Sequence, residues 1–215
     1  MVPAVERSSL LLRSLVLGGV VGTLVLACSP SSKSTDLGPD AVDSGRLPAP
    51  YYVPGRPCEV VIDTPELLAS PHVPEGTVVT YNSNPPSSGP HYPVWANFQE
   101  FATPLEDGYL VHSLEHGAVA LLYAGPSSST SVLNAEDMDA LRKIRDSLPT
   151  DPACDPATRV RVVIAPSRKL DVAVAAAAWG WTYRAKCVDV PTLSQFVKDH
   201  YAHSPENFCA EGRTF

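Results

Sequence analysis

The sequence predicts an α+β fold with a mainly antiparallel sheet, two helices late in the chain, and many proline-rich loops. Short β-branched and apolar runs bounded by Pro and Gly are typical of strands joined by turns. Two segments with helical spacing follow, both after residue 130. Proline accounts for 22 of the 215 residues, roughly twice the average usage of about 5%. Because proline lacks an amide donor, this content disfavours a helical bundle or a coiled coil.

The expected strands are the continuous apolar or β-branched runs at residues 59–62, 77–81, 117–123 and 159–165. Residues 172–183 are ambiguous, because a run of four consecutive alanines favours a helix while the Val-Ala-Val start and the Trp-Gly-Trp end favour a strand. We interpret this segment as a strand. Residues 82–93 contain four prolines and a glycine, which indicates a stiff loop.

The two expected helices lie at residues 134–148 and 189–203. Asn134 is a suitable N-cap for the first helix, and acidic residues follow it in the first turns. Apolar residues then recur at helical spacing until Pro149 ends the helix. The second helix has Pro191 near its start and an apolar face. His200 and His203 lie on this helix, and we expect both to be exposed to solvent.

The N-terminal residues 1–27 are typical of a bacterial lipoprotein signal peptide. Arg7 and Arg13 precede a 14-residue apolar run, which is shorter than the roughly 20 residues that span a bilayer. The run ends at Ala27-Cys28, so Cys28 is the expected lipidation site, although an ordinary secretory signal with a chance cysteine remains an alternative. Ser29 after Cys28 resembles an outer-membrane sorting preference. We therefore expect a lipid anchor that holds the protein at the outer membrane, facing the periplasm.

Two further segments follow the expected anchor. Residues 28–50 are rich in Ser, Pro, Gly and Asp and lack any apolar period, which predicts a flexible tether. Residues 51–215 form one expected globular domain, because their length suits a single core.

The four remaining cysteines predict two disulfides in an exported chain. None lies in a Cys-x-x-Cys pair, which argues against a thiol-redox motif. The sequence allows three pairings. We expect Cys58 to pair with Cys209 and Cys154 with Cys187, and unpaired buried thiols are the alternative.

Charge and motif content exclude several functions. The net charge is −7 and no basic run occurs, so nucleic acid is not an expected partner. Neither a Gly-x-Ser-x-Gly motif nor a Gly-rich phosphate loop is present. Only two methionines occur, which excludes a Met-rich Cu(I) carrier.

Four of the six histidines gather in the middle of the chain and form a candidate metal site. His112 and His116 are four residues apart, so they share a face on a helix and also on a strand. His72 and His91 flank the proline-rich loop, which could bring them to the same place. Converging neutral imidazoles are typical ligands of Zn²⁺ and Cu²⁺. The alternative is that these are separate surface or core histidines.

Glu115 lies beside His116 and is a candidate ligand, general base or supporting partner. His-x-x-Glu-His is also the inverted zincin pattern, which needs a helix and a distant acidic ligand. Gly117 and an apolar run follow at once, so we do not favour that interpretation.

Two long motifs resemble a known family. Tyr81-Asn-Ser-Asn-Pro-Pro-Ser-Ser-Gly-Pro-His-Tyr-Pro-Val-Trp95 and Val111-His-Ser-Leu-Glu-His-Gly-Ala-Val119 resemble the bacterial family catalogued as domain of unknown function 3105. The similarity covers roughly residues 58–203. It implies an exported or membrane-attached protein and no specific activity. It also implies that the polar signature residues are His72, Asn84, Ser88, His91, His112, Glu115 and His116.

Three functions are compatible with these observations. The leading hypothesis is a membrane-tethered envelope domain with a His-rich site for a divalent ion such as Zn or Cu. The second is a metal-dependent enzyme in which Glu115 acts as a general base. The third is a metal-free interaction module that uses the proline-rich loop. The sequence indicates no particular substrate or protein partner.

Overall fold

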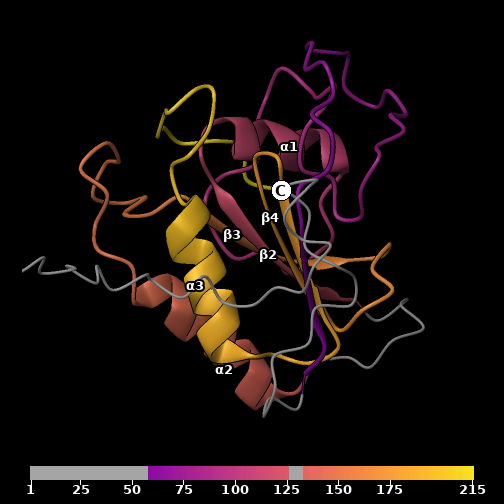
Figure 1. Cartoon of the computed structure of the whole chain (residues 1–215). Coiled ribbons are helices and arrows are strands. Elements are labelled where there is room, and N and C mark those ends of the chain that lie inside the picture. The colour runs from indigo at the N-terminus through magenta and orange to yellow at the C-terminus, as the bar shows by residue number, and fades with distance from the viewer. Residues whose placement is uncertain (1–57, 126–132) are drawn as a thin grey trace, which may run out of the picture. The chain divides into compact units, whose positions relative to one another are not determined.

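A computed structural model describes residues 58–125 and 133–215, which form a mixed α+β fold around one five-stranded sheet (Figure 1). The strand order is β1-β5-β4-β2-β3, and every neighbouring pair except β2 and β3 is antiparallel. The mainly antiparallel α+β prediction is therefore confirmed. The strands are β1 (Val60–Asp63), β2 (Val119–Ala124), β3 (Val162–Ser167), β4 (Val174–Ala178) and β5 (Trp181–Ala185).

The ambiguous alanine-rich segment forms the hairpin β4–β5. Trp179 and Gly180 make its turn, and Gly180 has a φ of 74°, which favours glycine. All five residues of β4 are buried, because this strand lies between β2 and β5 with both faces covered. Small alanine side chains suit this central position, where helix propensity is overridden by packing.

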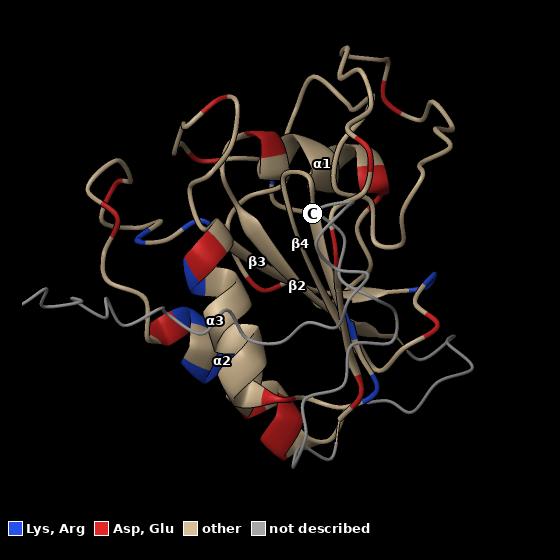
Figure 2. Cartoon of the chain, viewed as in Figure 1, with Lys and Arg blue, Asp and Glu red and all other residues tan. Residues whose placement is uncertain are grey.

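Helices α2 (Ala135–Asp146) and α3 (Val190–His200) cover one face of the sheet, where they contact each other. Asn134 caps α2 by accepting the Asp137 amide at 2.9 Å, in a reciprocal capping box. Figure 2 shows acidic residues at the start of α2 and basic residues in its later turns, which suits the helix dipole. The parallel pairing of β2 with β3 follows from this arrangement, because α2 provides the crossover between them.

The opposite face of the sheet carries α1 (Asp107–Glu115) and the loops that precede it. The sequence did not predict this helix. Every residue from Gly108 to Glu115 is buried, so α1 has no polar face that would produce an amphipathic period. Within the described residues, no helix is both long and apolar enough to cross a lipid bilayer.

The prediction of a strand at residues 77–81 is wrong. This run forms no strand in the described part of the chain, and Val78 is 94% exposed. The segment is instead held by side chains, such as the Tyr81 hydroxyl that donates to the Pro90 carbonyl at 2.8 Å. A β-branched run therefore does not indicate a strand by itself, because strand propensity depends on the packing context.

Both disulfides are present, but the expected pairing is wrong. The bonds join Cys58 to Cys187 and Cys154 to Cys209. The first bond follows from the register of β1 and β5, in which Val60 lies opposite Ala185. Two residues further out on each antiparallel strand, position 58 faces position 187. The second bond attaches the C-terminal segment to the loop between α2 and β3.

Candidate metal centre

The candidate centre forms where two loop segments meet the second half of α1. His72 and His91 lie side by side through an isolated parallel bridge. The Val73 amide donates to the His91 carbonyl at 2.7 Å, and the His91 amide donates to the Pro71 carbonyl at 3.2 Å. The backbone itself therefore brings together two histidines that are 19 residues apart in sequence.

His112 and Glu115 come from α1, three residues apart and hence on one face of the helix. With His72 and His91 they form a group whose four ligand atoms all lie within 4.8 Å of one another. His91, His112 and Glu115 are buried, with exposed fractions of 0%, 3% and 6%, whereas His72 is exposed to solvent. The group thus consists of three buried donors and a fourth donor at the surface.

Backbone carbonyls orient the two buried imidazoles. Nδ1 of His91 lies 2.9 Å from the Gly89 carbonyl, and Nδ1 of His112 lies 2.5 Å from the Tyr92 carbonyl. A carbonyl only accepts, so each neutral ring carries its proton on Nδ1 and its lone pair on Nε2. Metal-bound histidines in proteins usually donate their other ring N–H to such a carbonyl or to a carboxylate, which fixes the orientation of the ring.

Nε2 of His91 lies 2.9 Å from a carboxylate oxygen of Glu115. When Nδ1 of His91 donates to Gly89, its neutral ring offers only a lone pair to this carboxylate, which is also an acceptor. Nε2 of His91 therefore has no hydrogen-bond partner among the described residues. Two buried acceptors facing each other require a proton or a cation between them.

The separations in this group suit the ligands of a small ion. Ligands bound at about 2.0–2.1 Å lie about 2.9 Å apart at a right angle and about 3.4 Å apart at the tetrahedral angle. The contact between His91 and Glu115 falls in this range. The ring centroids of the three histidines are 4.7–4.9 Å apart.

Burial keeps the central imidazoles neutral. The pKa of His112 is lowered to about 4, chiefly by burial, and neighbouring histidines lower it further while its bond to the Tyr92 carbonyl opposes the shift. The pKa of His116 is also lowered by burial, against the opposing effect of Glu206. Neutral imidazole is the form that binds metal.

His116 lies next to the group and outside its closest set. Its Nε2 is 3.2 Å from Nε2 of His112 and 3.3 Å from the carboxylate of Glu206. Its Nδ1 is buried without a partner among the described residues. The structure therefore brings together His72, His91 and His112 of the four predicted histidines, adds Glu115 to them, and places His116 as an adjoining fifth donor.

Sequence reasoning missed Glu206, because it lies 90 residues after His116 in a segment without any motif. The C-terminal segment carries it to the end of α1, where the Glu206 amide donates to the Glu115 carbonyl at 3.1 Å. Buried Arg161 secures this segment through Asn207 while it pairs with Asp151.

Two family-signature residues, Asn84 and Ser88, support the proline-rich loop and do not join the group. The Asn84 amide donates to the Lys169 carbonyl at 2.8 Å, and the Ser88 hydroxyl accepts the Leu68 amide at 3.1 Å. Gly89 has a φ of 122°, and a Cβ there would crowd Leu68 and Tyr81. The loop thus holds His91 at a fixed place.

The two remaining histidines lie elsewhere in the fold: His200 ends α3, and His203 follows that helix, which is shorter than the predicted 189–203. His203 is exposed as expected. The expectation for His200 is wrong, because its ring is half-buried and stacks on Trp181 with 4.3 Å between centroids. These residues therefore serve as histidine controls outside the candidate centre.

Comparisons with known proteins agree with the motifs. No curated protein and no solved structure matches the chain. One family model matches residues 72–212, which include all the residues of the candidate centre. Because this match covers more than half of the chain, the protein belongs to the family described as protein of unknown function (DUF3105).

Proposed function

We propose that the domain binds one divalent transition-metal ion through His72, His91, His112 and Glu115. The observation that carries the proposal is the face-to-face contact between Nε2 of His91 and the carboxylate of Glu115. An ion between these atoms would satisfy both acceptors at once. A proton is the competing occupant, so binding should release protons and weaken at low pH.

The donor set favours zinc or copper. Three imidazole nitrogens and one carboxylate oxygen suit Zn²⁺ and Cu²⁺, whereas Mg²⁺ and Ca²⁺ prefer oxygen donors alone. The negative charge of Glu115 offsets part of the ion's charge in a site where three donors are buried.

The exposure of one donor, His72, supports metal handling more than a purely structural role. His72 is exposed, and no hydrogen bond of its ring within the described residues holds it in place. His116 offers a further nitrogen 3.2 Å from His112. A fourth ligand that can leave, with a spare donor nearby, suits a site that loads and releases its ion.

The test is titration of the full chain, purified without a histidine tag, with Zn²⁺ and separately with Cu²⁺. We expect about one equivalent of one of these ions to bind. His112→Gln should abolish this binding, because it removes a buried ligand. The double variant His200→Gln/His203→Gln, which removes two histidines outside the group, should bind like the wild type. Less than a tenth of an equivalent with both ions would refute the proposal.

We also propose that the domain is tethered to the cell envelope by a lipid on Cys28, at the outer membrane facing the periplasm. Support comes from the sequence alone, because residues 1–57 lie outside the described part of the chain. The two disulfides are compatible with export. Cys28→Ser should move the protein out of the membrane fraction, and a variant that stays fully membrane-bound would contradict the anchor.

A further inference from the structure

A second group of donors shares His112 with the candidate metal centre. Nε2 of His116 lies 3.2 Å from Nε2 of His112 and 3.3 Å from a carboxylate oxygen of Glu206. Ligands bound to one ion at about 2.0–2.1 Å lie about 2.9–3.4 Å apart, so both separations suit donors to the same ion. Two imidazoles and one carboxylate are also the ligands of zinc sites that keep a water in the fourth position.

In the empty protein, no tautomer of His116 satisfies all of these groups. Nε2 of His112 carries a lone pair, because its Nδ1 is directed at the Tyr92 carbonyl. A proton on Nε2 of His116 therefore lies between two acceptors, His112 and Glu206, while Nδ1 is a buried acceptor without a partner among the described residues. A proton on Nδ1 would leave three acceptors facing one another. An ion at Nε2 would bind all three donors at once, with the proton as its competitor.

We infer that His112, His116 and Glu206 form a second position for the bound ion. The inference rests on the proposed function, because both positions use the one lone pair of His112 Nε2. That lone pair binds one ion, so the two positions are occupied in turn and the stoichiometry stays at one. The second position should be the weaker, because it has fewer donors and no carbonyl among the described residues supports Nδ1 of His116.

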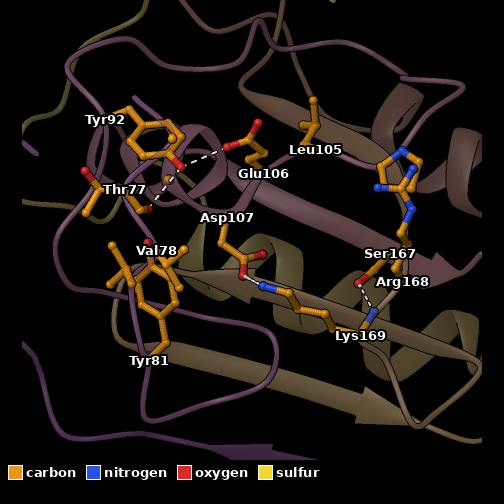
Figure 3. Close-up of a pocket in the computed structure, with 14 residues that line it drawn as sticks. Thr77, Val78, Tyr81, Tyr92, Leu105, Glu106, Asp107, Ser167, Arg168 and Lys169 are labelled. Atoms are coloured by element: carbon orange, nitrogen blue, oxygen red, sulfur yellow. Dashed lines mark hydrogen bonds and ion pairs between the residues drawn. The ribbon is translucent and has the colours of Figure 1, made fainter. Parts of the chain in front are cut away.

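Tyr92 keeps the shared His112 ring in place. Its carbonyl lies 2.5 Å from Nδ1 of His112. Its hydroxyl lies 2.8 Å from the Glu106 carboxylate and 3.2 Å from the Thr77 carbonyl (Figure 3). The Tyr92 ring also packs closely on Gly108, where a Cβ would lie 2.7 Å from it. His112 is thus held from outside the metal group, so the ion changes its other ligands while this ring stays.

The two positions include different exposed donors. The first includes exposed His72, and the second includes Glu206, whose side chain is 59% exposed. His116 and His112 are buried. When His72 releases the ion, His116 and Glu206 can therefore hold it within the domain. The second position should add little to the affinity of the complete site and should supply most of the affinity once the first position is damaged.

Competition between the full chain and a chelator for Zn²⁺, and separately for Cu²⁺, tests this inference. Glu206→Gln alone should weaken binding by at most about twofold, because the affinities of the two positions add and the first is the tighter. The double variant His72→Gln/Glu115→Gln leaves two neutral donors in the first position and should still bind one ion, more weakly. In this background, Glu206→Gln should weaken binding by at least about tenfold, since it removes the only charged ligand.

Glu211→Gln makes the same charge change five residues further along the same segment and should have no effect in either background. If the first double variant does not fold, His72→Gln/His91→Gln removes the first position from its loop side and should give the same result. Equal factors for Glu206→Gln in the wild-type and double-variant backgrounds would overturn the second position, and so would a folded double variant that binds no ion. A wild-type chain that binds no ion would refute the metal site as a whole.

Discussion

Glu115 presents a carboxylate oxygen to Nε2 of His91 at 2.9 Å, although the other nitrogen of that ring is already directed at the Gly89 carbonyl. The pair is buried, so water does not relieve the conflict between two acceptors. The arrangement is unfavourable in the empty neutral site and favourable with an ion. This asymmetry makes Glu115 the most informative residue to change.

Glu115→Gln should act in opposite directions on stability and on metal binding. An amide can donate to His91 Nε2. In urea unfolding, the metal-free variant should therefore have a free energy of unfolding equal to that of the wild type or higher by about 0.5–1.5 kcal/mol. It also loses the only negative ligand, so the metal-induced rise in melting temperature should largely disappear. Glu136→Gln, at an exposed position of α2, is the control. A variant that is less stable without metal would contradict the acceptor conflict.

Acidification should destabilise the metal-free protein between about pH 6.5 and pH 4. The pKa of His112 is about 4 in the folded protein, against about 6.5 for an ordinary histidine, so the unfolded chain binds the proton first as pH falls. The contribution is intact above about pH 6.5 and declines by at most about 1.4 kcal/mol per pH unit below it. The lowered pKa of His116 acts in the same direction.

Urea unfolding in the presence of a chelator at several pH values checks this expectation. His112→Gln should flatten the pH dependence, because it removes the group with the lowered pKa. His203→Gln changes an exposed residue and should leave the slope as in the wild type. An identical slope for the two variants would assign the acid sensitivity to other groups.

Gly108→Ala should destabilise the fold, although alanine is the better helix former. A Cβ at position 108 would lie 2.7 Å from the Tyr92 ring, and overpacking of this kind costs about 1–3 kcal/mol. The gain in helix propensity is only about 1 kcal/mol, so packing should prevail. Because the displaced Tyr92 supports His112, metal affinity should fall as well. As a control, Ala140→Gly in α2 measures the difference in helix propensity between alanine and glycine in this protein. A Gly108→Ala variant that is more stable than the wild type would refute the close packing.

Removal of the two disulfides should have different effects on the metal centre. Each loss should cost about 2–4 kcal/mol. Cys154→Ser/Cys209→Ser also frees the segment that carries Glu206 to His116, so we expect faster release of the ion to a chelator. Cys58→Ser/Cys187→Ser changes the far end of the β1–β5 pair and should leave the release rate unchanged. Equal release rates would exclude a role of the C-terminal segment in holding the ion.

Most strands and the helices α2 and α3 could be predicted because their signals are local: apolar or β-branched runs bounded by Pro and Gly for the strands, and a cap followed by helical spacing for the helices. Asn134 and its capping box are local signals, and the apolar period of α2 faces one core. Helix α1 lacked these signals, because it is buried all round and Gly117 ends it after nine residues. The strand expected at 77–81 failed for the reverse reason, since its composition suits a strand but no strand among residues 58–125 and 133–215 pairs with it.

The candidate site was partly predictable for a similar reason. The spacing of His112 and His116 predicted a shared face, whereas Glu115 joins the group only because the segment is a helix, which the sequence did not predict. The meeting of His72 with His91 depends on a backbone bridge that no local pattern encodes. Glu206 depends on the Cys154–Cys209 bond and the buried Arg161. Cysteine pairing needs the strand register, which a single sequence does not provide.

The bridge between His72 and His91 has a consequence for how the molecule opens. Between β1 and α1, residues 64–106 contain isolated bridges in place of helices or strands. Two of the four donors lie in residues 64–106 and two lie on α1. A bound ion would therefore link this segment to the helix. Amide hydrogen exchange in residues 64–106 should therefore slow on metal binding, while exchange in β2 and β4 stays governed by global unfolding. In the empty protein, an added protease should therefore cleave residues 64–106 faster than the strands of the sheet.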